Sequence, residues 1–441
     1  NVVNTGQGAD AGEGNTLSQE LLQVPRDISI VDLEDYTNNP YNTNSNYFSP
    51  YTNNPYWSVK ENATMVNGNR FYGNAYFSYK INDRFSASYQ LGGDYSSEDV
   101  KSYGAVVKFL PGSAQALAGA NAVVGGVTET TRERLEFDNN FILNYSNTIA
   151  EDFGINAFIG FNANQRKSSA LQAQITNLDI PYFYELSNSS IKPTVAQSNL
   201  ERKSYSVFAS FETSYKNFLY LTLTGRNDWT STLPIGNNSY FYPSAALSGI
   251  VLDSPDTFLK LRASYGQTGN ANIGDFASLG YYSSSVGYNG NSAIVPSTLS
   301  NKDLRWEKSN QVDVNLDIAF FKNRFAAGFN YYYKTSNDLL LNISIPTSSG
   351  YSQILQNKGK LENEGLEITF NTKNIEGKFS WYTDFNIAFN RNKVLDVDGL
   401  KPDAFDDKDL GNRGGEGRVV EGFPVGQFYV VEWAGVQQQE G

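Results

Sequence analysis

Apolar and polar side chains alternate along residues 135–149 of this sequence. From Leu135 onward every second residue is mostly apolar, and the residues between them are mostly polar. The alternation breaks at Ala150-Glu151-Asp152 and resumes at Phe153. Because successive side chains of a strand point to opposite faces, this pattern predicts two long β-strands joined by a very short turn.

The same pattern recurs in further hairpins, each with two alternating stretches around a short polar turn. Their turns lie at Asn82-Asp83-Arg84, Lys216-Asn217, Ser254-Pro255-Asp256, Lys322-Asn323-Arg324 and Ile375–Lys378. A phenylalanine follows every turn within one or two residues: Phe85, Phe153, Phe218, Phe258, Phe325 and Phe379. The spacing predicts about twelve strands between residues 70 and 392.

Long polar connections join the hairpins at their other ends. They are expected over Ser96–Arg132, Arg166–Arg202 and Gln267–Arg305, which are rich in Ser, Asn, Gly and Thr. A soluble β-sandwich also alternates, but it usually has shorter strands and more charge on its wet face. Long strands, short turns at one rim and long loops at the other are typical of an all-β, transmembrane, antiparallel, up-and-down β-barrel. We therefore expect periplasmic turns and extracellular loops.

In such a barrel the apolar set of side chains contacts lipid and the polar set lines a wet interior. The side chains expected to face lipid are Phe137, Phe141, Leu143, Ile155, Ile159, Val314, Leu316, Phe329, Ile368 and Phe385. Those expected to face the interior are Asp138, Asn156, Asp313, Asn315, Glu367 and Asp384.

Composition narrows the function classes. The net charge of −12 offers no basic stripe for phosphates, which argues against a nucleic-acid binder. The absence of His and Cys removes the commonest transition-metal ligands and every Ser-His or Cys-His nucleophile pair. No carboxylate pair stands out as catalytic. We expect no enzyme activity, no cofactor, no metal site and, since no apolar run reaches about 18 residues, no transmembrane helix.

Two glycine-rich segments, Gly6–Gly14 and Gly411–Arg418, resemble phosphate-binding loops only superficially. Neither has the flanking strand and helix that such a loop requires, so both are interpreted as flexible loops. The segment Thr16–Pro25 has a capping Thr, a Gln at the third helical position and a proline stop, and it predicts a short helix.

The segment Leu395–Gly399, together with Asp403, Asp406 and Asp407, offers a group of carboxylates. It lacks the ligand spacing of an EF-hand, so we interpret these residues as surface carboxylates. Whether the loops bind calcium stays open at this point.

Several segments, in order along the chain, resemble the barrel of SusC/RagA-type TonB-dependent transporters from the outer membrane of Bacteroidota-type bacteria. They are "NNPYWSVKEN" (Asn53–Asn62), "LTLTGRNDWTSTLPIGNNSYFYPSAALS" (Leu221–Ser248), "LKLRASYGQTGN" (Leu259–Asn270), "LRWEKSNQVDVNLDIAFFKNR" (Leu304–Arg324), "NKGKLENEGLEITF" (Asn357–Phe370) and "EGFPVGQFYVVEWAGV" (Glu421–Val436). The resemblance extends from about Leu17 to the end of the chain.

The resemblance implies that residues 1–441 are part of a roughly 22-stranded barrel. Residues 1–69 would be mostly an extracellular loop and entry segment, residues 70–392 the strands, and residues 393–441 a long loop and the start of further strands. The plug domain, the segment that engages TonB and the C-terminal strands are expected to lie outside this chain.

The resemblance also implies a function. A SusD-like surface lipoprotein would deliver an oligosaccharide or a peptide, and the TonB complex would energise its import. The alternatives are a passive porin and, less favoured, a surface adhesin anchored by the barrel. Aromatic residues near the strand–loop junctions could stack on substrate or form an interfacial girdle instead. These substrate-contact candidates are Tyr56, Trp57, Trp229, Tyr240, Tyr242 and Trp306.

Overall fold

A computed structural model describes residues 2–3, 17–150, 152–270, 273–286, 292–351, 353–397, 417–428 and 435. Its short helices are α1 (Leu17–Leu22), α2 (Pro55–Glu61) and α3 (Ala114–Leu117), with 3-10 turns η1 (Val31–Glu34), η2 (Asn44–Asn46) and η4 (Thr347–Ser349). The helix predicted at Thr16–Pro25 is confirmed by α1. None of the helices in the described ranges has the length and apolar character needed to cross a membrane.

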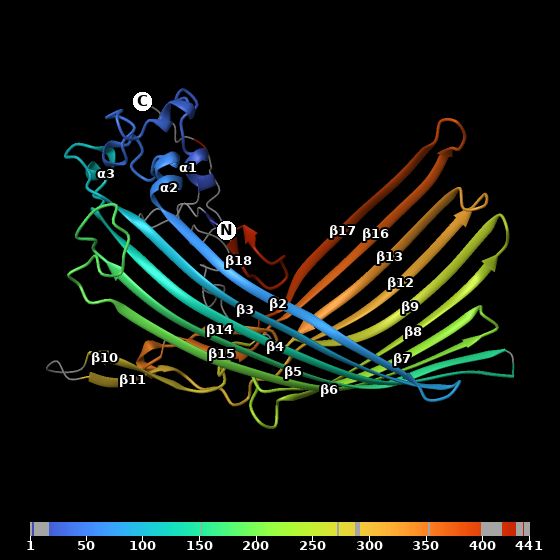
Figure 1. Cartoon of the computed structure of the whole chain (residues 1–441). Helices are drawn as coiled ribbons and strands as arrows, with labels where there is room; N and C mark the ends of the chain where they lie inside the picture. Colours follow the sequence, from blue (N-terminus) through green and yellow to red (C-terminus); the bar gives the residue numbers. More distant parts are fainter. Residues whose placement is uncertain are drawn as a thin grey trace. The chain divides into compact units, whose positions relative to one another are not determined.

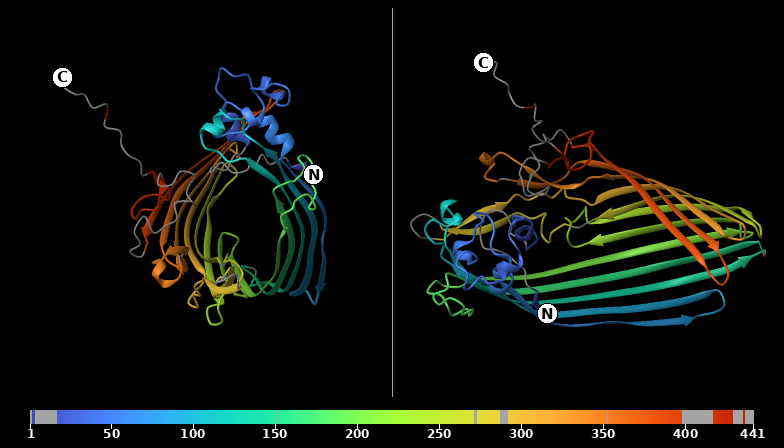
Figure 2. Two further views of the ribbon diagram at one scale, coloured as in Figure 1. Left: turned by 90° about the vertical axis from the view of Figure 1, so that its left-hand side faces the viewer. Right: turned by 90° about the horizontal axis from the view of Figure 1, so that it is seen from above.

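Thirteen strands form one sheet, and their order in the sheet is their order in the sequence. They are β1 (Val2–Val3), β2 (Ala63–Lys80), β3 (Phe85–Val107), β4 (Val123–Ile149), β5 (Phe153–Thr176), β6 (Thr194–Tyr215), β7 (Leu219–Thr230), β8 (Ser239–Asp253), β9 (Thr257–Asn270), β12 (Glu307–Phe320), β13 (Phe325–Asn337), β16 (Lys360–Ile375) and β17 (Trp381–Asp396). Figures 1 and 2 show β7–β9, β12, β13, β16 and β17 side by side as an up-and-down meander.

Three small hairpins of the described residues lie outside this sheet. They pair β10 (Tyr281–Val286) with β11 (Ser292–Thr298), β14 (Leu340–Ser344) with β15 (Gln353–Asn357), and β18 (Gly417–Arg418) with β19 (Gln427–Phe428). The chain divides into two compact units, which are described separately. Unit 1 comprises Asn1–Asn74, Gly92–Phe137 and Gln165–Glu201, and unit 2 comprises Ala75–Leu91, Asp138–Asn164 and Arg202–Gly441.

Strand register in unit 2 separates apolar from polar side chains. Leu316 lies opposite Leu261 on one neighbouring strand and Phe329 on the other. Asn315, the next residue, lies opposite Arg262 and Asn330. Because directly opposed side chains share a face, we call the face of Leu316 the apolar face and the face of Asn315 the polar face.

The register confirms the predicted separation of the two sets in these strands. Val314, Leu316, Phe329, Ile368 and Phe385 share the apolar face, and Asp313, Asn315, Glu367 and Asp384 share the polar face. The apolar face is not covered by this chain, since Val314, in mid-strand, is 49% exposed. It is therefore not the inner surface of a soluble core.

The apolar band has the height of a membrane. On β12 it runs from Val312 to Phe320, nine residues whose eight steps of about 3.4 Å span about 27 Å along an antiparallel strand. Outer-membrane barrels carry an apolar band about 25 Å tall between aromatic girdles. Tyr331 and Tyr333 lie at its loop end, where their hydroxyls donate to Glu364 (3.4 Å) and Glu362 (2.9 Å).

The structure confirms the short turns but corrects two loop boundaries. β3 continues to Val107 and β4 starts at Val123, so much of Ser96–Arg132 is strand. Likewise β5 continues to Thr176 and β6 starts at Thr194, so Arg166–Arg202 is strand at both ends. At these strand ends the backbone pairing continues although both faces of the sheet are polar. Because apolar and polar residues then no longer alternate, the sequence does not show that these segments are strands.

The post-turn phenylalanines do not all lie on one face of the sheet. Phe153 packs at a tilt against Tyr215 (ring centroids 4.8 Å apart), and Phe325 lies opposite Phe320 on the apolar face. Phe258 lies opposite Ala319 and so is on the polar face. One extra residue separates Phe258 from its turn, and each one-residue step changes the face.

The N-terminal segment of unit 1 is held by buried polar groups. Asn54 caps α2, accepting from Tyr56 N (2.9 Å), and its side-chain amide donates to the carbonyls of Leu33 (2.9 Å) and Asn42 (3.0 Å). An unpaired buried amide would be costly, so these bonds fix the path of the chain around α2.

Glu20 of α1 is fully buried, and its Oε1 accepts from the Ser58 hydroxyl of α2 (2.7 Å). Burial raises the pKa of Glu20 to about 7, although hydrogen bonds from Ser58 and Asn53 act in the opposite direction. The phenol of Tyr47, also buried, has its pKa raised by burial and by Glu20. The α1–α2 contact therefore favours a neutral Glu20.

Leu316 lies at the centre of the apolar band. We expect Leu316→Arg to lower the free energy of unfolding of the full-length protein by about 2–4 kcal/mol, because the charge would enter the bilayer midplane. Asn315→Arg should cost far less, because that side chain is on the polar face. Urea titration in phospholipid vesicles measures both, and equal penalties would contradict the lipid assignment.

Glu20 should make the N-terminal segment sensitive to pH. Its folded pKa lies above the ordinary value of 4.5, so its stabilising contribution is complete below about pH 4.5 and disappears as pH rises through about 7. Hydrogen exchange of residues 17–62, corrected for intrinsic rates, should be faster at pH 8 than at pH 5. Glu20→Gln should remove that difference, whereas Glu34→Gln, at an exposed position, should retain it.

Candidate functional site

The polar face of unit 2 carries carboxylates that are paired across strands. Arg262 Nη2 donates to Asp317 Oδ2 at 2.8 Å from β9 to β12. Between β13 and β16, Asn330 Nδ2 donates to Glu367 Oε2 at 3.0 Å. Each carboxylate thus receives a donor from a neighbouring strand, which holds its side chain in place.

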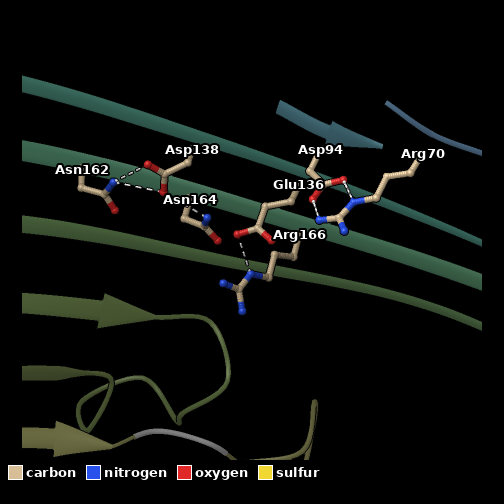
Figure 3. Close-up of polar contacts among 7 residues, drawn as sticks. All are labelled: Arg70, Asp94, Glu136, Asp138, Asn162, Asn164 and Arg166. Atoms are coloured by element: carbon tan, nitrogen blue, oxygen red, sulfur yellow. Dashed lines mark hydrogen bonds and ion pairs between the residues drawn. The ribbon is translucent and has the colours of Figure 1, made fainter. Parts of the chain in front are cut away.

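Asp138 of β4 is held in the same way. Both of its oxygens accept from Asn162 Nδ2 (3.1 and 3.2 Å), and Oδ2 also accepts from Asn164 Nδ2 at 3.1 Å (Figure 3). Asn162 and Asn164 are two residues apart on β5, so both side chains point to the same face.

Unit 1 has comparable pairs between its long strands. Arg70 Nε donates to Asp94 Oδ1 and Arg166 Nε donates to Glu136 Oε1, both at 2.9 Å (Figure 3). Lys101 contacts Glu129 at 3.1 Å. These exposed pairs contribute little to stability individually.

The described residues contain no group of three or more potential ligands that could hold a metal ion. Asp403, Asp406, Asp407, Gly6–Gly14 and most of Gly411–Arg418 lie outside the described residues. The interpretation of those segments stays a prediction. What the polar face offers is an array of hydrogen-bonding groups suited to contacting a solute.

Two of the six predicted aromatic residues lie on α2 in unit 1. Trp57 is buried against Ala105 and Val107, and Tyr56 is half-buried, with its backbone N–H capped by Asn54. The indole of Trp57 therefore belongs to a small core at the strand ends.

Trp306 is also buried, in unit 2, against Leu233, Ile273 and Leu304. Tyr240 stacks on it, with ring centroids 6.1 Å apart and an interplanar angle of 26°. This small core anchors the loops above β7, β8 and β12.

The neighbouring loop is fixed by Arg305, which donates to Asp338 at 2.7 Å. That hydrogen bond raises the pKa of Arg305. Asn357 also accepts from Arg305 N (2.9 Å) and donates to its carbonyl (2.7 Å), which ties the β14–β15 hairpin to the start of β12.

Trp229 and Tyr242 lie on opposite faces. Trp229 lies opposite Tyr205 on the apolar face, as in the interfacial-girdle alternative. Tyr242 is on the polar face, where its hydroxyl accepts from Arg226 Nε (3.1 Å). Its ring centroid is 5.6 Å from that of Tyr240.

The structure thus brings Tyr240, Tyr242 and Trp306 together and places Trp229 on the other face. Substrate contact by any of the six stays a prediction. Sequence analysis missed Phe158, Phe208 and Arg226, which lie on the polar face of β5, β6 and β7, and of which Arg226 contacts Tyr242. A usable signal was present for Phe158, a large apolar residue at a polar position of the alternation in β5.

Comparison with known proteins gives several matches. The family model described as TonB dependent receptor-like, beta-barrel matches residues 18–427. TonB-dependent receptor P26 of Formosa agariphila is 32% identical over 332 residues, which are 72% of this chain and 33% of that protein. TonB-dependent receptor SusC of Bacteroides thetaiotaomicron is 31% identical over 250 residues, or 52% of this chain and 25% of SusC. The chain thus spans about a third or less of these two relatives.

The fold is similar to that of the RagAB peptide transporter, with a TM-score of 0.74 and 21% sequence identity. That match covers 88% of this chain and 42% of the other chain. Together these findings confirm the predicted transmembrane antiparallel β-barrel class, the SusC/RagA-like resemblance and the outer-membrane location, and the family is not enzymatic. The match over residues 18–427 shows that this chain belongs to the TonB dependent receptor-like, beta-barrel family.

Proposed function

We propose that the full-length protein imports oligosaccharides or peptides across the outer membrane, energised by the TonB complex. The observation that carries this proposal is a family-matched sheet with an uncovered apolar face and a hydrogen-bonding polar face. SusC and the RagAB peptide transporter, to which the chain is similar, support transport over an adhesive role.

We also propose that a SusD-like surface lipoprotein delivers the substrate. A suitable docking surface is the loop of residues 177–193 between β5 and β6, which we call the β5–β6 loop. It exposes Ile180, Tyr182, Phe183 and Ile191, with Tyr182 67% exposed. Clustered exposed apolar side chains are typical of interaction surfaces.

Buried Asn188 makes this loop rigid. Its Oδ1 accepts from Ile180 N (3.0 Å), and its Nδ2 donates to the carbonyls of Ile180 (2.8 Å) and Phe183 (2.5 Å). A loop held in one conformation loses little entropy when it binds, which favours a stable protein interface.

Replacing Ile180, Tyr182 and Phe183 together by Ser in the full-length protein tests the partner. We expect at least about a tenfold loss of lipoprotein co-purified from detergent extracts, with an unchanged amount of barrel, because apolar contact residues dominate binding energy. Ile235→Ser, at a fully exposed position in the β7–β8 connection, is the matched control and should retain the partner.

The same cells distinguish the proposed importer from a passive porin. Uptake of radiolabelled oligosaccharides or peptides should disappear when TonB is deleted and fall in the triple variant. A barrel that never co-purifies with a lipoprotein and conducts solutes without TonB would establish the porin alternative.

A further inference from the structure

Residues from three neighbouring strands form a layered cluster on the polar face of unit 2. Gly160 of β5, Phe208 of β6 and Arg226 of β7 lie next to one another. The Arg226 guanidinium carbon lies 5.3 Å from the centroid of the Phe208 ring. A Cβ built on Gly160 would lie 2.4 Å from two carbons of the Phe208 ring. Glycine at this position therefore lets the ring lie against β5.

Three acceptors orient the guanidinium. Arg226 Nε donates to Asp228 Oδ1 (2.7 Å) and Tyr242 Oη (3.1 Å), and Nη2 donates to Ser206 Oγ (2.6 Å). Ser206 is buried, and the Asp228 side chain is only 15% exposed. The Arg226 side chain remains 39% exposed, so part of this fixed side chain is accessible to a solute.

A second aromatic side chain, Phe158, packs against Phe208 from the neighbouring strand β5. Phe158 of β5 contacts Phe208 edge to face, with ring centroids 6.0 Å apart. It lies on the polar face, because Asn156, two residues earlier, donates to Glu212, and Glu212 lies opposite Thr222 on that face. Phe158 is 37% exposed, so part of its ring is accessible from the polar face.

The charge and the hydrogen-bonding groups of the cluster indicate which class of ligand it can bind. Arg226 and Asp228 neutralise each other locally, so the cluster offers no net charge to capture an anion. The Tyr242 hydroxyl, which accepts from Arg226, keeps its hydrogen for donation. The cluster combines an aromatic ring with adjacent hydrogen-bond donors and an acceptor. A pyranose ring is complementary to that combination, since it has one face of C–H groups and a rim of hydroxyls.

We propose that Phe158, Arg226 and Tyr242 form a binding site for a neutral sugar ring on the polar face. This site rests on the proposed import function and specifies its substrate class. The ring stacks on Phe158, and its hydroxyls bond to Arg226 and Tyr242. Asp228, Ser206 and Phe208 are positioning residues that hold the guanidinium, and Gly160 leaves room for Phe208.

Fluorescence polarisation tests the site. Purified full-length protein is titrated into fluorescently labelled neutral hexasaccharides of glucose, xylose and mannose. At least one glycan should bind, and Arg226→Ala and Phe158→Ala should each raise its Kd about tenfold or more. Gly160→Ala retains every binding group but displaces Phe208, and it should weaken binding similarly. Arg226→Lys keeps the charge but loses the planar stacking and should not restore binding.

Arg262→Ala is the matched control, since Arg262 is a comparably exposed, carboxylate-paired arginine on the same face. It should change the Kd less than about twofold, and heat-modifiable gel mobility should show all variants folded. The proposal is overturned if no neutral glycan binds, if Arg262→Ala weakens binding as much as Arg226→Ala, or if only peptides show a dependence on Arg226. In that last case, TonB-dependent uptake of peptides would still support the proposed import function.

Discussion

Every backbone N–H and C=O in the membrane-facing part of this chain must find its partner inside the sheet, because hydrocarbon offers none. That constraint fixes the register between neighbouring strands, as at Leu316, Leu261 and Phe329. A slip of one residue would turn every apolar side chain to the polar face, so the register is strongly specified. The hydrogen-bond ladder therefore determines the lipid surface and the lining surface at the same time.

The sequence predicts the parts of the structure in which one face of the sheet meets lipid and the other meets water. Within the apolar band each residue is assigned to lipid or to water, so the alternation marks strands, faces and turns, as around Lys322-Asn323-Arg324. Beyond the apolar band both faces of the sheet meet water. The two faces then no longer require different residue types. The ends of β3–β6 are held by the same ladder, yet polar pairs such as Lys101 and Glu129 give no periodic signal.

The aromatic candidates show a second limit. Trp57, Trp229 and Tyr242 are all aromatic and all near strand ends, but they lie in a core, on the apolar face and on the polar face, respectively. The face of Trp229 follows from its spacing to Leu223 and could have been predicted. The burial of Trp306 could not, because it depends on Leu233 and Ile273, which reach it through distant loops. Phe158, an exception to the alternation, is visible in the sequence, whereas aromatic character alone does not distinguish these three environments.

Contacts between neighbouring strands hold the charged side chains of the polar face in place. Asp317 is paired with Arg262, Asp228 with Arg226, and Asp138 accepts from two asparagine amides. A wall of unpaired carboxylates would hold cations tightly and repel anions over roughly a Debye length. Pairing restricts each charge to short-range, directional hydrogen bonds, and conduction through a protein requires contacts that are numerous but individually weak enough to release the solute. The cross-strand contacts thus hold the side chains of the wall in fixed positions, from which they offer directional hydrogen bonds to a solute.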